Sequence, residues 1–162
     1  MRYHGIERCS LVNGTGVRAV LWVAGCEHHC KGCHNSYSWD PDLGVLFEEA
    51  DKKKLMDAIG KSWSDGVTFS GGDPLYPANR EEITALAKEI KELYPDKSIW
   101  MYTGYSWEEV WELEVMQYVD VLVDGKFIEE LKDESYKYAG STNQRTIDVK
   151  ESLKHGRIKI YF

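Results

Sequence analysis

Residues 17–33 of the chain read VRAVLWVAGCEHHCKGC. Residues 17–23 are mainly apolar and β-branched, a composition that predicts a buried strand. Cys26, Cys30 and Cys33 follow at the spacing C-x3-C-x2-C. A buried strand that leads into three neighbouring thiols predicts a metal-binding loop at the carboxyl end of that strand.

The rest of the chain alternates short β-rich runs with amphipathic stretches. This alternation predicts an α/β fold with a mostly parallel sheet and right-handed crossovers. We expect an open partial (β/α) barrel of about five or six mostly parallel strands, formed by residues 1–162 as a single domain. The further strands are expected at residues 67–70, 98–102, 119–123, 145–149 and 157–162, and the helices at residues 48–64, 79–93, 106–116 and 127–132.

Apolar periodicity defines the two longest of these helices. Leu55, Ile59 and Trp63 recur at the spacing of one helix face. The apolar stripe of the second helix ends with Leu93, just before Pro95 as a stop signal.

Three further signals mark element ends. Asn79, with an acidic residue three positions later, predicts the start of the second long helix. Ser106 and Glu109 form a capping-box pattern, in which each side chain accepts a bond from the other's backbone amide. Apolar residues alternate with polar ones in residues 157–162, which predicts a final strand.

Charge and hydropathy exclude several functional classes. The formal net charge is −7 and no stripe of Lys and Arg is present, whereas nucleic acid binding requires a basic surface. Lys52-Lys53-Lys54 lies among acidic residues and indicates a solvated helix face. No apolar run approaches the ~20 residues that span a bilayer, and residues 1–10 lack the apolar segment of a secretory signal. We therefore expect a cytoplasmic protein with neither nucleic acid nor membrane as partner. In such a reducing compartment, clustered cysteines indicate a metal site rather than disulfides.

The cysteine loop suits an iron–sulfur cubane, because thiolates are the usual ligands of such clusters. Cys26, Cys30 and Cys33 would bind three irons and leave the fourth open to a substrate. Zinc is the main alternative, because the loop also contains histidines and zinc accepts a Cys3His ligand set. Thiols without a metal are a third possibility. Cys9 lies away from the loop and receives no ligand role.

The histidines of the loop are His28, His29 and His34. For His28 and His29 we expect either a polar loop near solvent or hydrogen bonding around the site.

A glycine turn follows the strand expected at residues 67–70. Its sequence is Ser70-Gly71-Gly72-Asp73-Pro74. Two residues without a Cβ let the backbone approach a small ligand, and the acidic neighbour can neutralise an ammonium group. Alone, this pattern is equally typical of an ordinary strand-to-helix turn.

The candidate residues follow four expected strands: Cys26, Gly71, Thr103 and Asp124. In parallel α/β folds the carboxyl ends of the strands form the ligand site. For Asp124, common strand-end turn chemistry explains the residue equally well.

The cysteine loop and the glycine turn together resemble the radical S-adenosylmethionine superfamily. Further segments narrow the resemblance to the family of activating proteins of the anaerobic (class III) ribonucleoside-triphosphate reductase. These segments are residues 12–18, 34–35, 39–40, 102–105, 120–125 and 140–145, within a resemblance that covers about residues 3–150.

The resemblance implies a 4Fe–4S cluster on the three cysteines and S-adenosylmethionine as second cofactor, bound to the open iron. It also implies the cofactor-binding residues Gly32, Cys33, His34, Ser70, Gly71, Gly72, Asp73 and Thr103. The turn that contains Asp73 would hold the amino group, Gly32 to His34 would border the adenine, and Thr103 and Asp124 would meet the carboxylate or ribose. Many members have an aromatic residue where this chain has Gly32, and many have Glu where it has Asp73.

The implied activity is that of an oxidoreductase that generates a glycyl radical. One-electron reduction of S-adenosylmethionine would give methionine and a 5′-deoxyadenosyl radical, which removes a hydrogen from a glycine of the reductase large subunit. A one-electron donor such as a flavodoxin-type protein is implied as a further partner. Asn143, Gln144 and Arg145 would line the site or the docking surface, and Arg145 equally suits a structural ion pair.

Three alternatives stay open at this point. The chain could activate another glycyl radical enzyme, such as pyruvate formate-lyase. It could be a zinc-stapled interaction module without enzymatic activity. It could also be an electron-transfer protein that uses Cys9 as a fourth cluster ligand.

Overall fold

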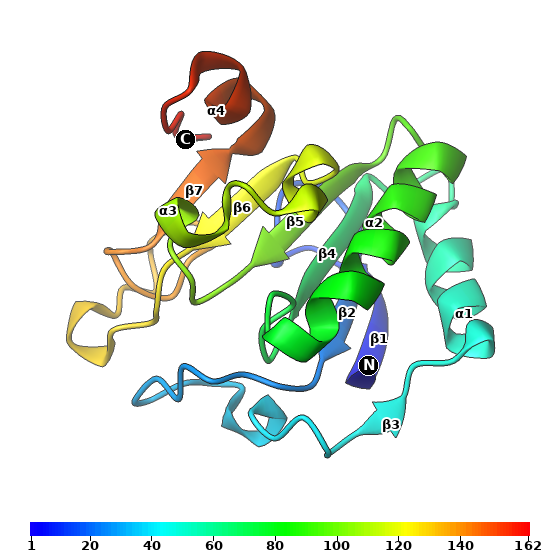
Figure 1. Ribbon diagram of the computed structural model, residues 1–162, viewed down its shortest axis with the longest axis horizontal. Helices are drawn as coiled ribbons and strands as arrows, with labels where there is room; N and C mark the ends of the chain where they lie inside the picture. Colours follow the sequence, from blue (N-terminus) through cyan, green and yellow to red (C-terminus); the bar gives the residue numbers. More distant parts are fainter.

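The computed structural model describes residues 1–162 and contains one open sheet of seven strands (Figure 1). The strands are β1 (Arg2–Ser10), β2 (Arg18–Val23), β3 (Val45–Leu46), β4 (Gly66–Gly71), β5 (Ser98–Tyr102), β6 (Val121–Asp124) and β7 (Arg145–Asp148). Their order across the sheet is β3-β1-β2-β4-β5-β6-β7.

Four α-helices and four short 3-10 turns connect the strands. The α-helices are α1 (Glu49–Ile59), α2 (Arg80–Leu93), α3 (Trp107–Val110) and α4 (Val149–His155). The 3-10 turns are η1 (Ser36–Ser38), η2 (Pro77–Asn79), η3 (Glu114–Gln117) and η4 (Glu129–Leu131). None of the helices combines the length and apolarity that crossing a membrane requires.

The middle of the sheet is parallel and its two sides are antiparallel. β2, β4, β5 and β6 run parallel to one another. β1 pairs antiparallel with β2 and β3, and β7 pairs antiparallel with β6. Because β3 and β7 are separate edges, the sheet stays open, as predicted. It has seven strands rather than five or six, since the largely polar β1 and the short β3 lack the apolar pattern that identifies a strand.

α1 and α2 cover one face of the sheet and bury the main core against it (Figure 1). Leu55 and Ile59 of α1 and Ile83 and Ile90 of α2 are fully buried, as is Phe69 of β4. Burial of each such side chain contributes about 1.5–3 kcal/mol to folding. The core therefore holds the central strands in place, and with them the loops at their carboxyl ends.

The helix predicted at residues 48–64 extends too far at its carboxyl end. α1 ends at Ile59 rather than at residue 64, because Gly60 caps it. Trp63 consequently lies outside the helix and is half exposed, and Leu93 at the end of α2 is exposed as well. The helix prediction is wrong for residues 60–64, because the apolar spacing continues in the sequence after Gly60 has ended α1, whereas α2 extends to Leu93 as predicted.

The helix signals themselves have mixed outcomes. The capping box of α3 is confirmed, since Ser106 and Glu109 bond to each other's backbone amides. α3 nevertheless ends at Val110, and the separate turn η3 replaces the predicted continuation to residue 116. Asn79 makes no capping bond and donates instead to two loop carbonyls beyond the ends of β2 and β4.

The strand predicted at residues 157–162 does not form. A single bridge joins Ile160 to Ile147 of β7, after the unpredicted helix α4 has intervened. The terminal segment packs through aromatic rings instead. The ring of Tyr161 lies 5.4 Å from that of Trp100, which points to the sheet face opposite α1 and α2.

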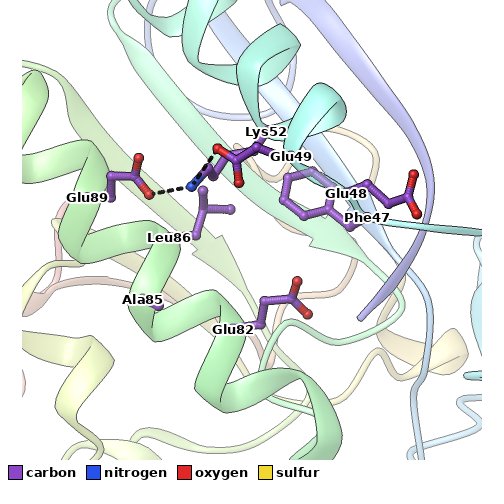
Figure 2. A pocket seen from close by; sticks show the side chains of 8 residues that line it. All are labelled: Phe47, Glu48, Glu49, Lys52, Glu82, Ala85, Leu86 and Glu89. Carbon is purple, nitrogen blue, oxygen red and sulfur yellow. Dashed lines mark hydrogen bonds and ion pairs between the residues drawn. The ribbon is translucent and has the colours of Figure 1, made fainter.

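Lys53 and Lys54 of α1 are exposed, as predicted for the run of lysines, whereas Lys52 is partly buried and its ammonium group lies between α1 and α2 (Figure 2). Lys52 pairs with Glu49 at 3.1 Å and with Glu89 of α2 at 3.0 Å. Lys54 pairs with Asp51 at 3.1 Å. The acidic neighbours of these lysines are therefore engaged in local ion pairs across and along the helices.

Arg18, the first residue of β2, is fully buried without an ion-pair partner. Its guanidinium donates to the carbonyls of Thr15, Val67 and Ser98 at 2.7–3.0 Å, and to the hydroxyls of Thr68 and Ser98 at 2.9 Å. Burial lowers the pKa of Arg18 to about 10, so that the group stays charged at neutral pH. One cation thus joins the amino ends of three parallel strands.

We predict that Arg18→Met lowers the free energy of unfolding by more than about 3 kcal/mol, because several buried carbonyls and hydroxyls lose their donor. The free energy of unfolding of Arg18→Lys should lie between those of the wild type and Arg18→Met, since one ammonium group cannot reach all the acceptors. Urea unfolding followed by circular dichroism measures this, with the exposed Arg8→Met as control. Equal stability of Arg18→Met and Arg8→Met would contradict the assigned role.

Candidate iron–sulfur site

The three thiols and the glycine turn meet in one hollow at the carboxyl edge of the sheet. Cys26, Cys30 and Cys33 line this hollow together with residues 70–73 and Thr103. The cavity itself has a volume of about 150 Å³, and it is open to solvent. The remaining lining residues are His28, Asn35, Trp39, Tyr102, Gly104, Gly125, Phe127 and Gln144. Segments far apart in the sequence are thereby brought to one place.

The cysteine loop crosses the sheet edge from β2 toward the segment after β6 (Figure 1). At its start, the amide of Cys26 donates to the carbonyl of Trp39 at 2.9 Å. Near its end, Lys31 pairs with Glu129 of η4 at 3.0 Å. The loop is therefore anchored on both sides of the hollow.

Gly71 and Gly72 allow two backbone segments to approach closely. A Cβ on Gly71 would lie 2.5 Å from the backbone nitrogen of Val23, and one on Gly72 would lie 2.5 Å from the carbonyl oxygen of Gly25. Gly71 also has a φ of +108°, which other residues rarely adopt. The glycine pair therefore lets Asp73 lie directly beside the start of the cysteine loop.

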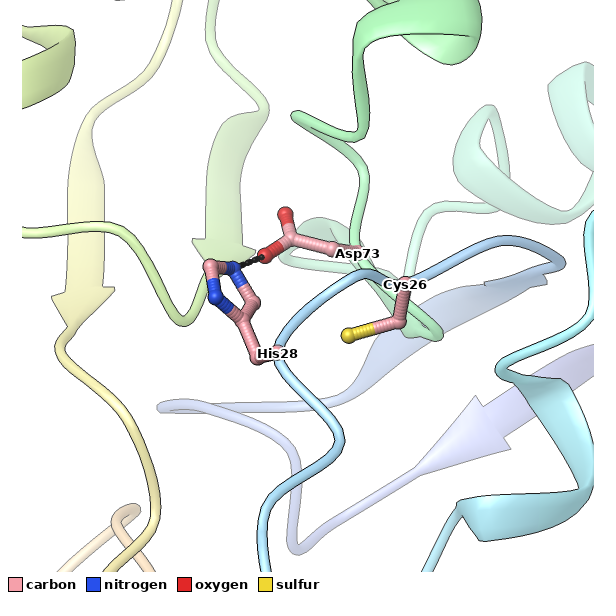
Figure 3. Close-up of side chains that lie close together, drawn as sticks. All are labelled: Cys26, His28 and Asp73. Atoms are coloured by element: carbon pink, nitrogen blue, oxygen red, sulfur yellow. Dashed lines mark hydrogen bonds and ion pairs between the residues drawn. The ribbon is translucent and has the colours of Figure 1, made fainter.

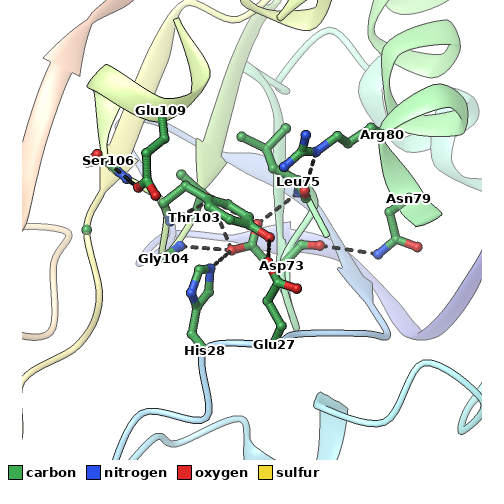
Figure 4. A network of polar contacts seen from close by, with 12 residues as sticks. Glu27, His28, Asp73, Leu75, Asn79, Arg80, Thr103, Gly104, Ser106 and Glu109 are labelled. Carbon is green, nitrogen blue, oxygen red and sulfur yellow. Dashed lines mark hydrogen bonds and ion pairs between the residues drawn. The ribbon is translucent and has the colours of Figure 1, made fainter. Parts of the chain in front are cut away.

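The Asp73 carboxylate is the centre of a buried hydrogen-bond network (Figure 4). It accepts bonds from the Thr103 hydroxyl at 2.9 Å, the Gly104 amide at 2.9 Å and the Leu75 amide at 2.8 Å. The Nε2 atom of His28 lies 2.9 Å from its Oδ2 atom. Asp73 is only 1% exposed. An ionised carboxylate offers about four acceptor sites, so that these donors satisfy it in place of water.

Burial and backbone amides act in opposite directions on the thiols. Burial raises the pKa of Cys26 to about 11 and also raises the pKa of Cys30. Hydrogen bonding from loop amides opposes this at Cys26, and the backbone of Phe127 does so at Cys30. The amide of Asn35 donates to the Sγ atom of Cys33 at 3.4 Å. Such amides stabilise the thiolate, which is the form that binds metals.

Thiol spacing distinguishes the two metal interpretations. Two thiolates on one zinc ion lie at most about 4.6 Å apart, because each Zn–S bond is about 2.3 Å long. The three loop cysteines do not gather within 4.8 Å of one another. The one group of possible ligand atoms that does so consists of Cys26, His28 and Asp73 (Figure 3). The three thiols are therefore not gathered as closely as a Cys3His zinc site requires.

Two residues named for the adenine do not line the hollow. Gly32 has a φ of +75°, and a Cβ there would point at Glu129. The ring of His34 lies 6.3 Å from the ring of Phe127. Their contact with the adenine stays a prediction, and the aromatic side chains that do line the hollow are those of Trp39, Tyr102 and Phe127.

Of residues 143–145, only Gln144 lines the hollow. Its side-chain amide donates to the carbonyl of Gly125 at 2.9 Å. The side-chain amide of Asn143 donates to the carbonyl of Lys126 at 2.8 Å. Both residues therefore brace the segment after β6.

Arg145 forms ion pairs at the outer side of this segment. Its guanidinium lies 2.5 Å from buried Asp124 and 2.9 Å from Glu108. The hydrogen bonds that its guanidinium donates to these two carboxylates raise the pKa of Arg145. Asp124 also accepts the amide of Trp107 at 2.7 Å. The geometry supports the structural interpretation of Arg145, which joins β7 to the end of β6 and the start of α3.

His28 and Tyr105 take part in the site more closely than their sequence context indicated. The His28 side chain is only 5% exposed, so that it hydrogen-bonds at the site rather than facing solvent. The hydroxyl of Tyr105 donates to the carboxylate of Glu27, and burial raises the pKa of Tyr105. In the sequence, His28 is marked only by its position between two cysteines, and Tyr105 only by the Thr-Gly-Tyr segment after β5. Neither pattern reveals which residues these side chains contact.

Comparison with known proteins agrees with this geometry. The sequence model of the 4Fe-4S single cluster domain family matches residues 12–147. An anaerobic ribonucleoside-triphosphate reductase-activating protein of Enterobacteria phage T4 is 46% identical over 90% of this chain and 92% of its own length. Proteins of the same name are 40% identical in Haemophilus influenzae and 38% identical in Escherichia coli, each over 89% of this chain and 96% of the relative. With a matching cluster domain and relatives that align over nearly their full lengths, the chain belongs to the anaerobic ribonucleoside-triphosphate reductase-activating protein family.

Proposed function

We propose that this chain binds a 4Fe–4S cluster through Cys26, Cys30 and Cys33 and cleaves S-adenosylmethionine reductively. We further propose that it thereby generates a glycyl radical on the large subunit of the anaerobic ribonucleotide reductase. The observation that carries the proposal is the hollow in which three thiols face the Gly71–Asp73 turn. The names of the relatives support the choice of target.

The donor set fits the cluster. Three thiols with backbone amide donors supply three ligands, and no fourth cysteine lines the hollow. When bound, the cluster supplies the electron that cleaves S-adenosylmethionine into methionine and a 5′-deoxyadenosyl radical. The protein needs no acid or base for this cleavage. Its residues hold the reactants, orient them and limit access of water.

Different groups around the hollow would bind different parts of S-adenosylmethionine. The backbone of Gly71 and Gly72 offers polar groups to the amino group of S-adenosylmethionine. Asp73 contributes its negative charge nearby, but its lone pairs are already engaged. Tyr102 and Phe127 supply apolar surface for the adenosine in place of the aromatic residue missing at Gly32.

The open side of the hollow supports a protein substrate. The reductase would complete the wall of the site and present its glycine to it. Gln144 lines the hollow and Asn143 braces the segment after β6, whereas Arg145 holds the ends of β6 and β7 together. A flavodoxin-type protein is the proposed electron donor. Residues 1–162 would act as one domain in the cytoplasm, where thiols stay reduced.

We predict that the anaerobically reconstituted and reduced protein forms 5′-deoxyadenosine from S-adenosylmethionine, and that Cys30→Ala abolishes this. Removing one of three thiolates leaves the cluster without a complete ligand set. The exposed Cys9→Ala serves as matched control and should retain the activity. Loss in Cys9→Ala would indicate a four-cysteine electron-transfer site instead, and uptake of zinc without iron would indicate an interaction module.

The target can be tested separately. Mixing the reduced enzyme and S-adenosylmethionine with the anaerobic ribonucleotide reductase should give the electron paramagnetic resonance doublet of a glycyl radical. The same mixture with pyruvate formate-lyase should give no such signal. The reverse result would replace the proposed target while leaving the cleavage chemistry intact.

A further inference from the structure

Each of the three residues between Cys26 and Cys30 has its own anchor. Glu27 accepts the hydroxyl of Tyr105. His29 adopts a φ of +48°, which is uncommon for a residue other than glycine, and its ring lies 4.7 Å from that of Trp39. His28 lies between them with its side chain buried. The segment that carries two of the three thiols is thus restrained at consecutive positions.

His28 is held from three directions (Figure 4). Its Nε2 atom lies 2.9 Å from Asp73 Oδ2. Its ring packs edge-on against Tyr105, with centroids 4.4 Å apart and an interplanar angle of 74°. A Cβ on Gly104 would lie 2.3 Å from the imidazole, so that the neighbouring backbone closes the third side.

Asp73 is a rigid acceptor for this histidine. Its carboxylate is fixed by Thr103 and by the amides of Leu75 and Gly104, all from outside the cysteine loop. Because a carboxylate only accepts hydrogen bonds, the Nε2 atom of His28 carries the proton of this contact. The bond therefore ties the cysteine loop to a point that the ends of β4 and β5 determine.

We propose that His28 is a positioning residue, whose hydrogen bond to Asp73 holds the Cys26–Cys30 segment at a fixed place relative to the Gly71–Asp73 turn. The cluster ligands and the backbone for S-adenosylmethionine then keep one geometry, with or without the cluster. This inference rests on the proposed function for its consequence, but the loop position can be measured on the cluster-free chain.

Lys31 provides a probe of loop position. It lies one residue after Cys30, its side chain is 81% exposed, and trypsin cleaves after lysine. In the cluster-free protein, His28→Ala should increase the rate of tryptic cleavage after Lys31 by about 10-fold, because loss of a hydrogen bond to a charged group shifts the local opening equilibrium of the loop by about that factor. His28→Gln should stay within about twofold of the wild type, since its amide can donate to Asp73.

The cluster gives a second readout. After anaerobic reconstitution, a chelator should remove iron from His28→Ala about 10-fold faster than from the wild type, with His28→Gln again close to the wild type. In His28→Ala, S-adenosylmethionine should also cause a smaller change in the electron paramagnetic resonance spectrum of the reduced cluster than it causes in the wild type. His155→Ala, on the exposed face of α4, is the matched control for loss of an imidazole. Thermal unfolding of each cluster-free variant shows whether it is folded.

If folded His28→Ala and the wild type show the same rates of tryptic cleavage and of iron loss, the positioning role is overturned. The proposed function would still stand in that case, provided that the wild type cleaves S-adenosylmethionine. Failure of His28→Gln to restore the tryptic readout would also overturn the positioning role, because the amide donor would then not replace the imidazole. Failure to restore only the rate of iron loss would overturn it as well, since the imidazole would then act as a metal ligand beside Cys26 and Asp73 (Figure 3). A wild-type protein that takes up no iron would overturn the proposed function, and this inference with it.

Discussion

The buried carboxylate of Asp73 is the constraint on which the site depends. It lies at the end of β4 and is bonded to the end of β5 through Thr103 and Gly104, and to the cysteine loop through His28. An unsatisfied carboxylate in this place would be costly, because burial of a charge without hydrogen bonds is strongly unfavourable. The four donors therefore act together, and moving any one of the three segments would leave the charge under-satisfied.

The parallel part of the fold could be predicted from the sequence because its signals are local. Residues 98–102 form β5 as predicted, since β-branched and aromatic residues stand between polar ends. β1 could not be predicted, because its pairing with β2 and β3 depends on partners elsewhere in the chain. Trp63 shows the opposite failure, where a local apolar spacing continues after Gly60 has ended the helix.

The candidate site divides in the same way. The spacing of Cys26, Cys30 and Cys33 is a local pattern, and the hollow brings these residues to the glycine turn. Contacts between distant segments leave no such pattern. The bond of His28 to Asp73 spans 45 positions, and that of Tyr105 to Glu27 spans 78. Such pairs become visible only when the ends of the strands are placed side by side.

The two ends of the parallel sheet bury charges of opposite sign. At the amino end, Arg18 is a buried cation satisfied by carbonyls and hydroxyls, and the strands are closed tightly around it. At the carboxyl end, Asp73 is a buried anion satisfied by amides, a hydroxyl and an imidazole, beside a hollow that stays open to solvent. The contacts of Arg18 fix the amino ends of the strands, so that the few hydrogen bonds of Asp73 are sufficient to position the loops at the carboxyl ends. An anionic site beside that opening also favours S-adenosylmethionine, whose sulfonium and ammonium groups are both positive, and the open side leaves room for a protein substrate.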